Sequence, residues 1–387
     1  MKKTIEDIDV TGKRVLMRVD FNVPIRDGII TDDRRIKMAI PSIKSVLDRG
    51  GCITLISHLG RPSGNGFEEG CSLAPVAIRL SELLGQPVSF SDEDSASPII
   101  LRENVRFHSG EKRGEEAFAK QLAKGADIYC NDAFGTAHRT HASMVAVPEV
   151  MAGKPRVAGL LLAKELQYLS DAIEHADHPF IAILGGAKVS DKIGAIEHLL
   201  GKVDTILIGG AMAYTFLAAM GEQVGESLVE QGRLEDAAST LVAGQASTTN
   251  LLLPTDHVCV QHLEKDAKVE ISTGGIQEGW MGVDIGPETI ATFQTQILQS
   301  KTIVWNGPMG VFETEPFDVG TREIAKAIAM ATKDNALSII GGGDSAAAIS
   351  AFGLEGQMTH ISTGGGASVQ MLEGIAFSSV ALLDDAV

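Results

Sequence analysis

The sequence contains little cysteine, and its four cysteines lie far apart. Cys52, Cys71, Cys130 and Cys259 form no CxxC pair and no paired Cys/His motif. This pattern argues against a zinc site and against a disulfide framework. We expect reduced, partly buried thiols and therefore a cytoplasmic protein.

Long apolar runs are missing as well. No segment reaches the roughly 18 apolar residues that a membrane span needs. The first ten residues, MKKTIEDIDV, carry acids where a signal peptide has its apolar stretch. We expect neither a membrane partner nor a secretion signal. The G-x-x-x-x-G-K-[ST] P-loop and the H-R-D set of protein kinases are also absent, which excludes these two classes of nucleotide site.

Net positive charge is the third absence. The chain has 387 residues and a formal net charge of -17 at pH 7, which disfavours nucleic acid as a partner. The charge is distributed unevenly along the chain. Residues 1–168 contain 23 Lys and Arg and 22 Asp and Glu, whereas the remainder contains 10 Lys and Arg and 28 Asp and Glu. Thirteen of the fifteen arginines fall in the first part. Arginine suits bidentate recognition of phosphate and carboxylate, so this part is suited to a small anion, unless the arginines are merely scattered unevenly over the surface.

Length and apolar patterning predict the fold class. A chain of this length favours two domains, and short Val/Ile/Leu-rich runs with room for a helix between them predict parallel strands buried on both faces. The predicted strands are RVLMRVD, CITLIS, PVSF, PIILRE and DIYC, then FIAILGG, TILIGG, NLLLPTD, HVCV, TIVWNG, LSIIGGG and THISTGG. The segment VAGLLLAKELQYLSDAIEH between the two sets has apolar residues at helical steps. We expect an α/β protein with two doubly wound parallel-sheet domains, residues 1–168 and 169–370, joined by a helix.

The residues at the strand ends differ between the two parts. In open parallel sheets, ligands bind at the carboxyl ends of the strands. Polar side chains follow the strands of the first part: Asp20, Asn22, His58, Arg61, Arg106, His138 and Arg139. The strands of the second part end in LGGAK, IGGAM, WNGPMG, GGGD and TGGG. Glycine lets a ligand approach the backbone amides, so we expect a nucleotide and its phosphates at this second edge.

The segment GGGDSAAA matches a dinucleotide-binding pattern. Gly341, Gly343 and Ala346 satisfy G-x-G-x-x-A, which taken alone predicts a dinucleotide site. However, the next predicted strand brings no acid to its end, and Asp344 would place a carboxylate beside the pyrophosphate. Such a carboxylate is favourable if Mg²⁺ lies between it and the phosphate oxygens. An ordinary helix N-cap with turn glycines remains the alternative.

Two lysines follow the first glycine pair of the second part. In GGAKVSDK, Lys188 and Lys192 are four residues apart, and they would share a face if both lay in the first turn of a helix. Lysines at a helix start oppose the helix dipole unless an anion is bound there. The preceding glycines favour phosphate binding over the alternative of solvated lysines.

The histidines do not predict a metal site. His58, His138 and His141 have arginines nearby, and the spacing in HRTH is not a metal-ligand spacing. We interpret His58 and His138 as hydrogen-bond donors to a bound anion, while His141 could equally be a polar surface residue. Asp20 and Asn22 could bind substrate hydroxyls or cap a turn.

The chain resembles the phosphoglycerate kinase family along nearly its whole length. The matching stretches occur in the family's order: RVDFNVP, SHLGRP, LRENVRF, NDAFGTAHR, LGGAKVSDK, GWMGVDIGP, TIVWNGPMGVFE, GGGDS and STGGGAS. The resemblance implies two domains facing across a cleft, with the C-terminal segment, about residues 371–387, packing on the N-terminal domain. It also implies a monomer that binds 3-phosphoglycerate or 1,3-bisphosphoglycerate together with ADP or ATP and Mg²⁺.

The same resemblance implies roles for individual residues. In the substrate site, Asp20 and Asn22 match residues that hold the glycerate hydroxyl and carboxylate. The predicted 3-phosphoglycerate site comprises Asp20, Phe21, Asn22, Arg35, His58, Leu59, Gly60, Arg61, Arg106, His138 and Arg139. The predicted nucleotide site comprises Lys192, Gly209, Gly210, Gly282, Asn306, Pro308, Glu313, Gly342, Gly343, Asp344 and Ser345. Arg35, Lys188 and Gly343 match the catalytic positions, and Asp344 matches the Mg²⁺ ligand.

The mechanism that the family implies requires no general base. Carboxylate and phosphate oxygens are already ionised at neutral pH, so catalysis must align the substrates and neutralise charge on the moving phosphoryl group. The chain departs from the family after STGGGAS, where VQMLEGIAFSSVALLDDAV lacks the usual Lys or Pro; this affects only the expected docking of the terminus. An NAD-dependent dehydrogenase and a non-catalytic binding descendant are the alternative functions.

Overall fold

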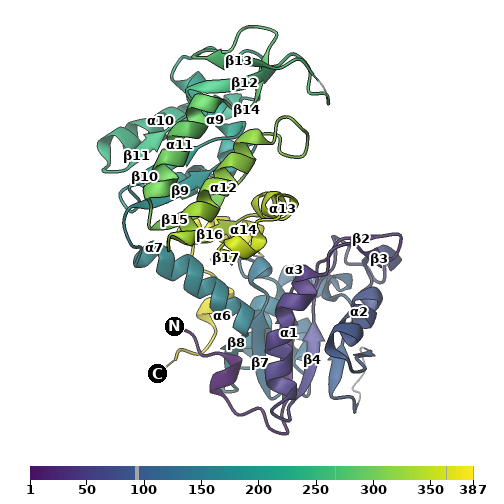
Figure 1. Ribbon diagram of the computed structural model, residues 1–387. Helices are drawn as coiled ribbons and strands as arrows, with labels where there is room; N and C mark the ends of the chain where they lie inside the picture. The colour runs from purple at the N-terminus through teal and green to yellow at the C-terminus, as the bar shows by residue number, and fades with distance from the viewer. Residues whose placement is uncertain (92–95, 266, 363, 387) are drawn as a thin grey trace. The chain divides into compact units, whose positions relative to one another are not determined.

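The computed structural model describes residues 1–91, 96–265, 267–362 and 364–386 (Figure 1). The chain forms two compact units. Unit 1 comprises Met1–Gln167 and Ala376–Val387, and unit 2 comprises Tyr168–Ile375.

Unit 1 is built on a six-stranded sheet in which every pair is parallel. Its strands are β1 (Arg14–Val19), β4 (Cys52–Ile56), β5 (Ser89–Phe90), β6 (Ile99–Leu101), β7 (Ile128–Asp132) and β8 (Arg156–Ala158), in the order β5-β6-β4-β1-β7-β8. The central strand β1 places Val15 opposite Ile53 of β4 and Ile128 of β7. The chain steps from β1 to β4 on one side and later reaches β7 on the other, so the order reverses at β1 and β7. A two-stranded hairpin, β2 (Ile25–Arg26) and β3 (Ile29–Ile30), follows β1.

Helices cover both faces of this sheet. On one face, Val15, Met17 and Val19 pack against buried residues of α1 (Arg34–Leu47) and α2 (Ala74–Leu84), next to α6 (Leu160–Leu166). The other face carries α3 (Ser109–Arg113), α4 (Glu116–Leu122), the π-helical turn Ala142–Ala146 and α5 (Val147–Val150). Helix α2 has proline in its first turn and ends at Gly85 with φ of 68°, the left-handed conformation that favours glycine.

Unit 2 contains a second parallel sheet of six strands. These are β9 (Phe180–Leu184), β10 (Thr205–Ile208), β11 (Asn250–Leu252), β15 (Thr302–Asn306), β16 (Leu337–Gly341) and β17 (His360–Ile361), in the order β11-β10-β9-β15-β16-β17. This is the doubly wound order of dinucleotide-binding sheets, and it reverses between β9 and β15. A ligand site is therefore expected beyond the carboxyl ends of these two strands.

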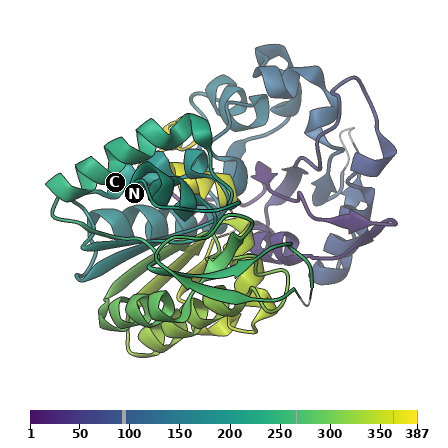
Figure 2. The same ribbon diagram turned by 90° about the horizontal axis from the view of Figure 1, so that it is seen from above.

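The helices of unit 2 lie in two layers with the sheet between them. Figure 2 shows the teal helices α8 (Ile193–Leu199), α9 (Met212–Ala219) and α10 (Leu234–Ala246) on one side, and the green helices α11 (Pro287–Gln299) and α12 (Val319–Lys333) on the other. Ile183 and Trp305 of the sheet pack with Phe293 of α11 and Ile328 of α12. Helices α13 (Gly343–Ala351) and α14 (Gly365–Leu372) complete the unit.

A separate antiparallel sheet corrects one strand prediction. HVCV lies in β12 (Asp256–Val260), which pairs antiparallel with β13 (Glu270–Thr273) and β14 (Met281–Ile285). The predicted parallel pairing of this strand is wrong. Its partner β13 is largely exposed and has no apolar run by which the sequence could reveal it.

The segment between the two sheets is helical. Helix α6 is followed by a π-helical turn, Gln167–Asp171, and by α7 (Ala172–Glu174). At the other end of the chain, the segment that belongs to unit 1 begins at Ala376 and includes the short helix α15 (Ser378–Ala381). Asp384 secures it, because its carbonyl accepts a hydrogen bond from the Lys3 amide at 2.8 Å and its carboxylate pairs with Arg156 at 3.1 Å.

The α/β class is confirmed, with parallel sheets flanked by helices in both units. In the part of the chain that the structure describes, no helix is both long and apolar enough to cross a membrane.

Candidate functional site

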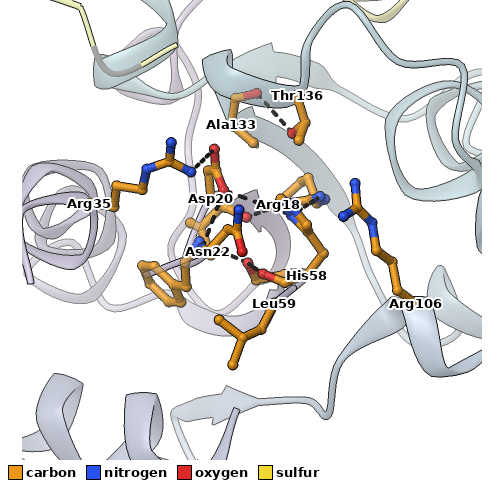
Figure 3. A network of polar contacts seen from close by, with 12 residues as sticks. Arg18, Asp20, Asn22, Arg35, His58, Leu59, Arg106, Ala133 and Thr136 are labelled. Carbon is orange, nitrogen blue, oxygen red and sulfur yellow. Dashed lines mark hydrogen bonds and ion pairs between the residues drawn. The ribbon is translucent and has the colours of Figure 1, made fainter. Parts of the chain in front are cut away.

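The polar residues after β1 and β4 meet at the carboxyl edge of the unit 1 sheet. The Asp20 carboxylate lies 2.9 Å from Nη1 of Arg35, which is in the first turn of α1. Its other oxygen is 3.8 Å from Nδ1 of His58. Figure 3 shows Asp20 and His58 between Arg35 on one side and Arg106 on the other. The structure thus brings four of the predicted substrate residues into one cluster.

A buried arginine lies beneath this cluster. Arg18 on β1 is 0% exposed, and its Nε donates to the Ser143 hydroxyl at 2.9 Å, while Nη1 donates to the Val19 carbonyl. Its Nη2 lies 3.2 Å from Nδ1 of His58. Because a guanidinium can only donate, Nδ1 of His58 must accept. His58 is therefore neutral and carries its proton on Nε2.

The charges of the cluster determine its protonation. Burial would raise the pKa of Asp20, but the charges of Arg35 and Arg18 and a hydrogen bond from the Asn22 amide hold it below its ordinary value. Burial lowers the pKa of His58 well below its ordinary value, and the nearby arginines add to the shift against the opposing charge of Asp20. At neutral pH the site thus presents an ionised carboxylate, a neutral imidazole and several guanidinium groups.

Backbone contacts fix the loops around the cluster. The Phe21 amide donates to the Ser57 hydroxyl at 2.8 Å, and the Gly60 amide donates to Oδ1 of Asn22 at 2.8 Å. Gly60 has φ of 64°, so a side chain at this position would be strained. The Leu59 carbonyl accepts a hydrogen bond from Nδ2 of Asn104 at 2.7 Å. The first two bonds join the segment after β1 to the segment after β4, and the third joins the latter to the segment after β6.

Arg106 is the most strongly perturbed cation of the site. Its Nη1 donates to the Gly60 carbonyl at 2.7 Å, whereas its buried Nε has no partner among the described residues. Burial, aided by Arg18 and Arg139, lowers its pKa to about 10. Arg61 and Arg139 are exposed. In the described parts of the chain their side chains form no hydrogen bond or ion pair, so both are available to a ligand.

The two remaining histidines follow β7. His138 is half-buried, its Nδ1 has no partner among the described residues, and burial lowers its pKa. His141 lies deeper, with Nδ1 3.7 Å from the buried carboxylate of Glu111. Burial and the surrounding arginines, Arg106 first, lower the pKa of His141 to about 4. Both rings are therefore neutral at pH 7.

Glycines form the carboxyl edge of the unit 2 sheet where the strand order reverses. A Cβ on Gly185 after β9 would lie 2.2 Å from the Pro308 carbonyl, and one on Gly210 would lie 2.5 Å from the Gly186 amide. A Cβ on Gly209 would lie 2.5 Å from the sulfur of Met309. The loops after β9, β10 and β15 are therefore packed backbone against backbone, as close approach of a ligand to main-chain amides requires.

Lys188 and Lys192 differ in their surroundings. They lie at the two ends of a 3₁₀ turn, Val189–Asp191, and only Lys192 borders a helix, as the N-cap of α8. The condition under which both lysines would share one helix face is therefore not met. Lys188 is exposed. Lys192 donates to Oδ1 of Asn306 at 2.8 Å, and burial lowers its pKa against the charges of Asp191, Asp344 and Glu373. The Asn306 Nδ2 atom is buried without a partner in the described chain.

The GGGDS segment begins α13 beside this lysine. Gly342 precedes the helix with φ of 91°, and an added Cβ on Gly343 would meet nothing within 4 Å. The Ser345 hydroxyl is buried and accepts a hydrogen bond from the Gly307 amide at 2.6 Å. Asp344 is exposed in the first turn. The helix N-terminus is thus open to an anion, with a carboxylate next to it that has no partner among the described residues.

Gly282 and Glu313 lie in other parts of unit 2. A Cβ on Gly282 would lie 2.0 Å from the hydroxyl of Tyr214, so no other residue fits there without displacing this ring. Glu313 is exposed in the loop after β15. No contact in the described structure joins Glu313 to the other predicted nucleotide residues.

The residues can hold Mg²⁺ only with help from a ligand. In the described chain, no group of three or more His, Cys, Asp or Glu side chains could hold a metal ion. Mg²⁺ commonly binds through one carboxylate together with substrate phosphates and water. Asp344 at an open helix N-terminus fits this mode.

Sequence reasoning missed Arg18, Ser57 and Asn104. The signal for Arg18 was present, since a strand that is otherwise buried carries an arginine one residue before its end. Asn104 is 3% exposed, and its side chain joins the segments after β4 and β6. Such contacts between segments distant in sequence leave no local pattern.

Comparison with known proteins identifies the family. Residues 5–375 match the family model described as phosphoglycerate kinase. The chain is 55% identical to phosphoglycerate kinase of Rhodopirellula baltica and 50% identical to that of Chloroherpeton thalassium, in each case over 100% of both chains. Its structure is similar to phosphoglycerate kinase from Coxiella burnetii, with a TM-score of 0.90, 40% identity and coverage of 99% of this chain and 98% of the other. The structure of the Pyrococcus horikoshii enzyme is similar with a TM-score of 0.84, 31% identity and the same coverage. Taken together with the two sheet edges described above, these matches show that the chain belongs to the phosphoglycerate kinase family.

Proposed function

We propose that the protein catalyses reversible phosphoryl transfer from 1,3-bisphosphoglycerate to ADP, giving 3-phosphoglycerate and ATP. The enzyme would be a phosphotransferase with a carboxyl group as acceptor, acting in glycolysis and gluconeogenesis. The observation that carries the proposal is the cluster around Asp20 in unit 1, in a chain 55% identical over its full length to a phosphoglycerate kinase.

The chemistry of this cluster suits a phosphorylated hydroxy acid. Arg61, Arg106 and Arg139 offer guanidinium donors to a phosphate or carboxylate. His58 offers Nε2–H, since its Nδ1 accepts from Arg18. Asp20 is ionised and can accept a hydrogen bond from a substrate hydroxyl, while Asn22 can hold the adjacent carboxylate.

Unit 2 supplies the complementary chemistry for a nucleotide. The open N-terminus of α13 and the backbone around Gly209, Gly210 and Pro308 suit phosphates and an adenosine. Lys192 would bind a nucleotide phosphate beside Asn306, and Glu313 would bind the ribose from its exposed loop. The walls around the base would include Gly282.

Mg²⁺ would be held by Asp344 together with the nucleotide phosphates. The bound ion would neutralise charge on the β- and γ-phosphates. The charge of Asp344 opposes the lowering of the Lys192 pKa, so the carboxylate lies within electrostatic range of the lysine. The lysine and the ion would therefore share the charge of the polyphosphate.

The protein's own residues would act by positioning and by electrostatic stabilisation. The attacking carboxylate or phosphate oxygen is already ionised, so no side chain has to remove a proton. Arg35 would give up part of its ion pair with Asp20 and contact the transferring phosphoryl group. The exposed Lys188 and the Gly343 amide would contact the same group from the nucleotide side. Each group is worth most when negative charge is spread over the phosphoryl oxygens.

Transfer requires that the two bound substrates meet. The anion residues belong to unit 1 and the glycine-rich edge belongs to unit 2, while reacting atoms must approach to about 3 to 3.5 Å in line. We therefore propose hinge bending along the helical segment around Gln167 when both substrates are bound. Small-angle scattering should give a smaller radius of gyration with 3-phosphoglycerate and Mg-nucleotide together than with either alone. An equal radius in all states would refute hinge bending.

The same proposal covers location and assembly. Free thiols at all four cysteines fit a cytoplasmic protein. We propose a monomer because one chain carries both substrate edges, one in each unit. A dehydrogenase is disfavoured, since β17 ends at Ile361 and neither this residue nor Ser362 after it is an acid that could bind the adenosine ribose of NAD.

A thermal-shift experiment tests ligand choice directly. ADP with Mg²⁺ should raise the melting temperature, 3-phosphoglycerate should do so without metal, and NAD should have no effect. Protection by NAD, or no protection by either expected ligand at millimolar concentration, would contradict the proposal.

A further inference from the structure

The C-terminal segment of unit 1 contacts the loop that carries two predicted substrate residues. This loop, residues 133–139, follows β7 and ends in His138 and Arg139. Helix α15 in the segment is a single turn, preceded by Phe377 as its N-cap.

Ser379 holds the loop through a buried hydrogen bond. Its side chain is 0% exposed, and its hydroxyl donates to the Ala137 carbonyl at 2.6 Å. Ala137 directly precedes His138 and closes the 3₁₀ turn Phe134–Thr136. The bond therefore fixes the peptide from which the His138 and Arg139 side chains leave the turn.

Phe377 holds the same loop through ring contacts. It is 7% exposed, and its ring centroid lies 6.5 Å from that of Phe134 and 6.5 Å from that of His138. The His138 ring is thus in contact with the C-terminal segment on one side. No hydrogen bond to Nδ1 fixes the ring, because this atom is buried without a partner among the described residues, so the contact with Phe377 is what limits its rotation on that side.

We infer that Phe377 and Ser379 are positioning residues for the 3-phosphoglycerate site. They hold residues 133–139 so that His138 and Arg139 face the bound anion, although neither touches it. The inference rests on the proposed function. It assigns a substrate-specific role to a segment that Asp384 also anchors, through Lys3 and Arg156.

Ser379→Ala and Phe377→Leu test this role, with Asp384→Asn as the matched control. The control weakens the pairing of Asp384 with Arg156 in the same segment without touching the loop. Ser379→Ala should raise KM for 3-phosphoglycerate about fivefold, the effect of one lost buried hydrogen bond. Phe377→Leu should raise the same KM because it removes the ring contact with His138. Their KM for ATP and kcat should stay near the wild-type values, and the control should leave both KM values unchanged.

Hydrogen exchange supplies a readout that does not depend on activity. Peptides covering residues 133–139 should exchange faster in both test variants and at the wild-type rate in Asp384→Asn. Unchanged exchange there, or an equal rise in KM for ATP, would overturn the inference. A wild-type protein without activity toward 3-phosphoglycerate would instead refute the proposed function, while the exchange result would still decide whether the segment positions the loop.

Discussion

Replacing His257 with phenylalanine should flatten the acid sensitivity of unit 2. His257 on β12 is 2% exposed, its Nδ1 has no partner in the described chain, and its ring packs 5.4 Å from that of Tyr214. Burial, opposed by Asp256, lowers its pKa to about 4. The unfolded chain would protonate the same residue near pH 6.5, so the unfolded state binds more protons below that pH.

The magnitude follows from these two pKa values. Stability is fully present above pH 6.5 and is lost as the pH falls toward 4. Between pH 8 and pH 5, His257 alone should reduce the free energy of unfolding by about 2 kcal/mol. Phenylalanine retains a ring against Tyr214 and cannot take up a proton, so its variant should lack this loss.

Tryptophan fluorescence provides the assay, since both tryptophans, Trp280 and Trp305, belong to unit 2. Urea unfolding at pH 8 and pH 5 would compare the wild type, His257→Phe and the control His262→Phe, whose histidine is exposed. The control should lose as much free energy as the wild type. Equal losses in the wild type and His257→Phe would refute the assignment of a buried neutral imidazole.

The remaining predictions concern single side chains. Arg35→Ala should lower kcat by about 10²-fold or more, because the negative charge on the phosphoryl group that Arg35 contacts is largest in the transition state. Arg139→Ala should mainly raise KM for 3-phosphoglycerate. Steady-state kinetics in which both variants change only KM would contradict these roles. Asp344→Asn should raise the Mg²⁺ concentration needed for half-maximal activity and leave 3-phosphoglycerate binding unchanged, and a titration at saturating nucleotide that shows no shift would exclude Asp344 as the ligand. Asp284 caps α12 by accepting from the Gly320 amide at 2.6 Å, as Asp256 caps α11 by accepting from the Thr289 amide at 2.8 Å. Asp284→Ala and Asp256→Ala should therefore each reduce stability by about 1 kcal/mol, and calorimetry that shows no loss in either variant would contradict the capping role.

The sequence predicted the parallel strands well because strands that are buried on both faces are rich in apolar residues. β1, β7, β9 and β15 are buried on both faces and consist mostly of apolar residues. By contrast, β13 is polar and exposed, so the antiparallel sheet could be found only from tertiary pairing.

The site divides in the same way. Side chains that directly follow a strand, such as Asp20 and His58, could be assigned to one sheet edge from topology alone. The buried donors beneath them could not, since Arg18 reaches Ser143 from a segment 125 residues away. The unequal environments of Lys188 and Lys192 likewise depend on a 3₁₀ turn that the sequence spacing does not reveal.

One measurement tests the central claim most directly: a coupled assay of ADP formation from ATP, Mg²⁺ and 3-phosphoglycerate. The account predicts turnover that requires all three components and falls by about 10²-fold or more in Arg35→Ala. ADP formation that does not depend on 3-phosphoglycerate, or no turnover by the wild-type protein at saturating substrates, would contradict it.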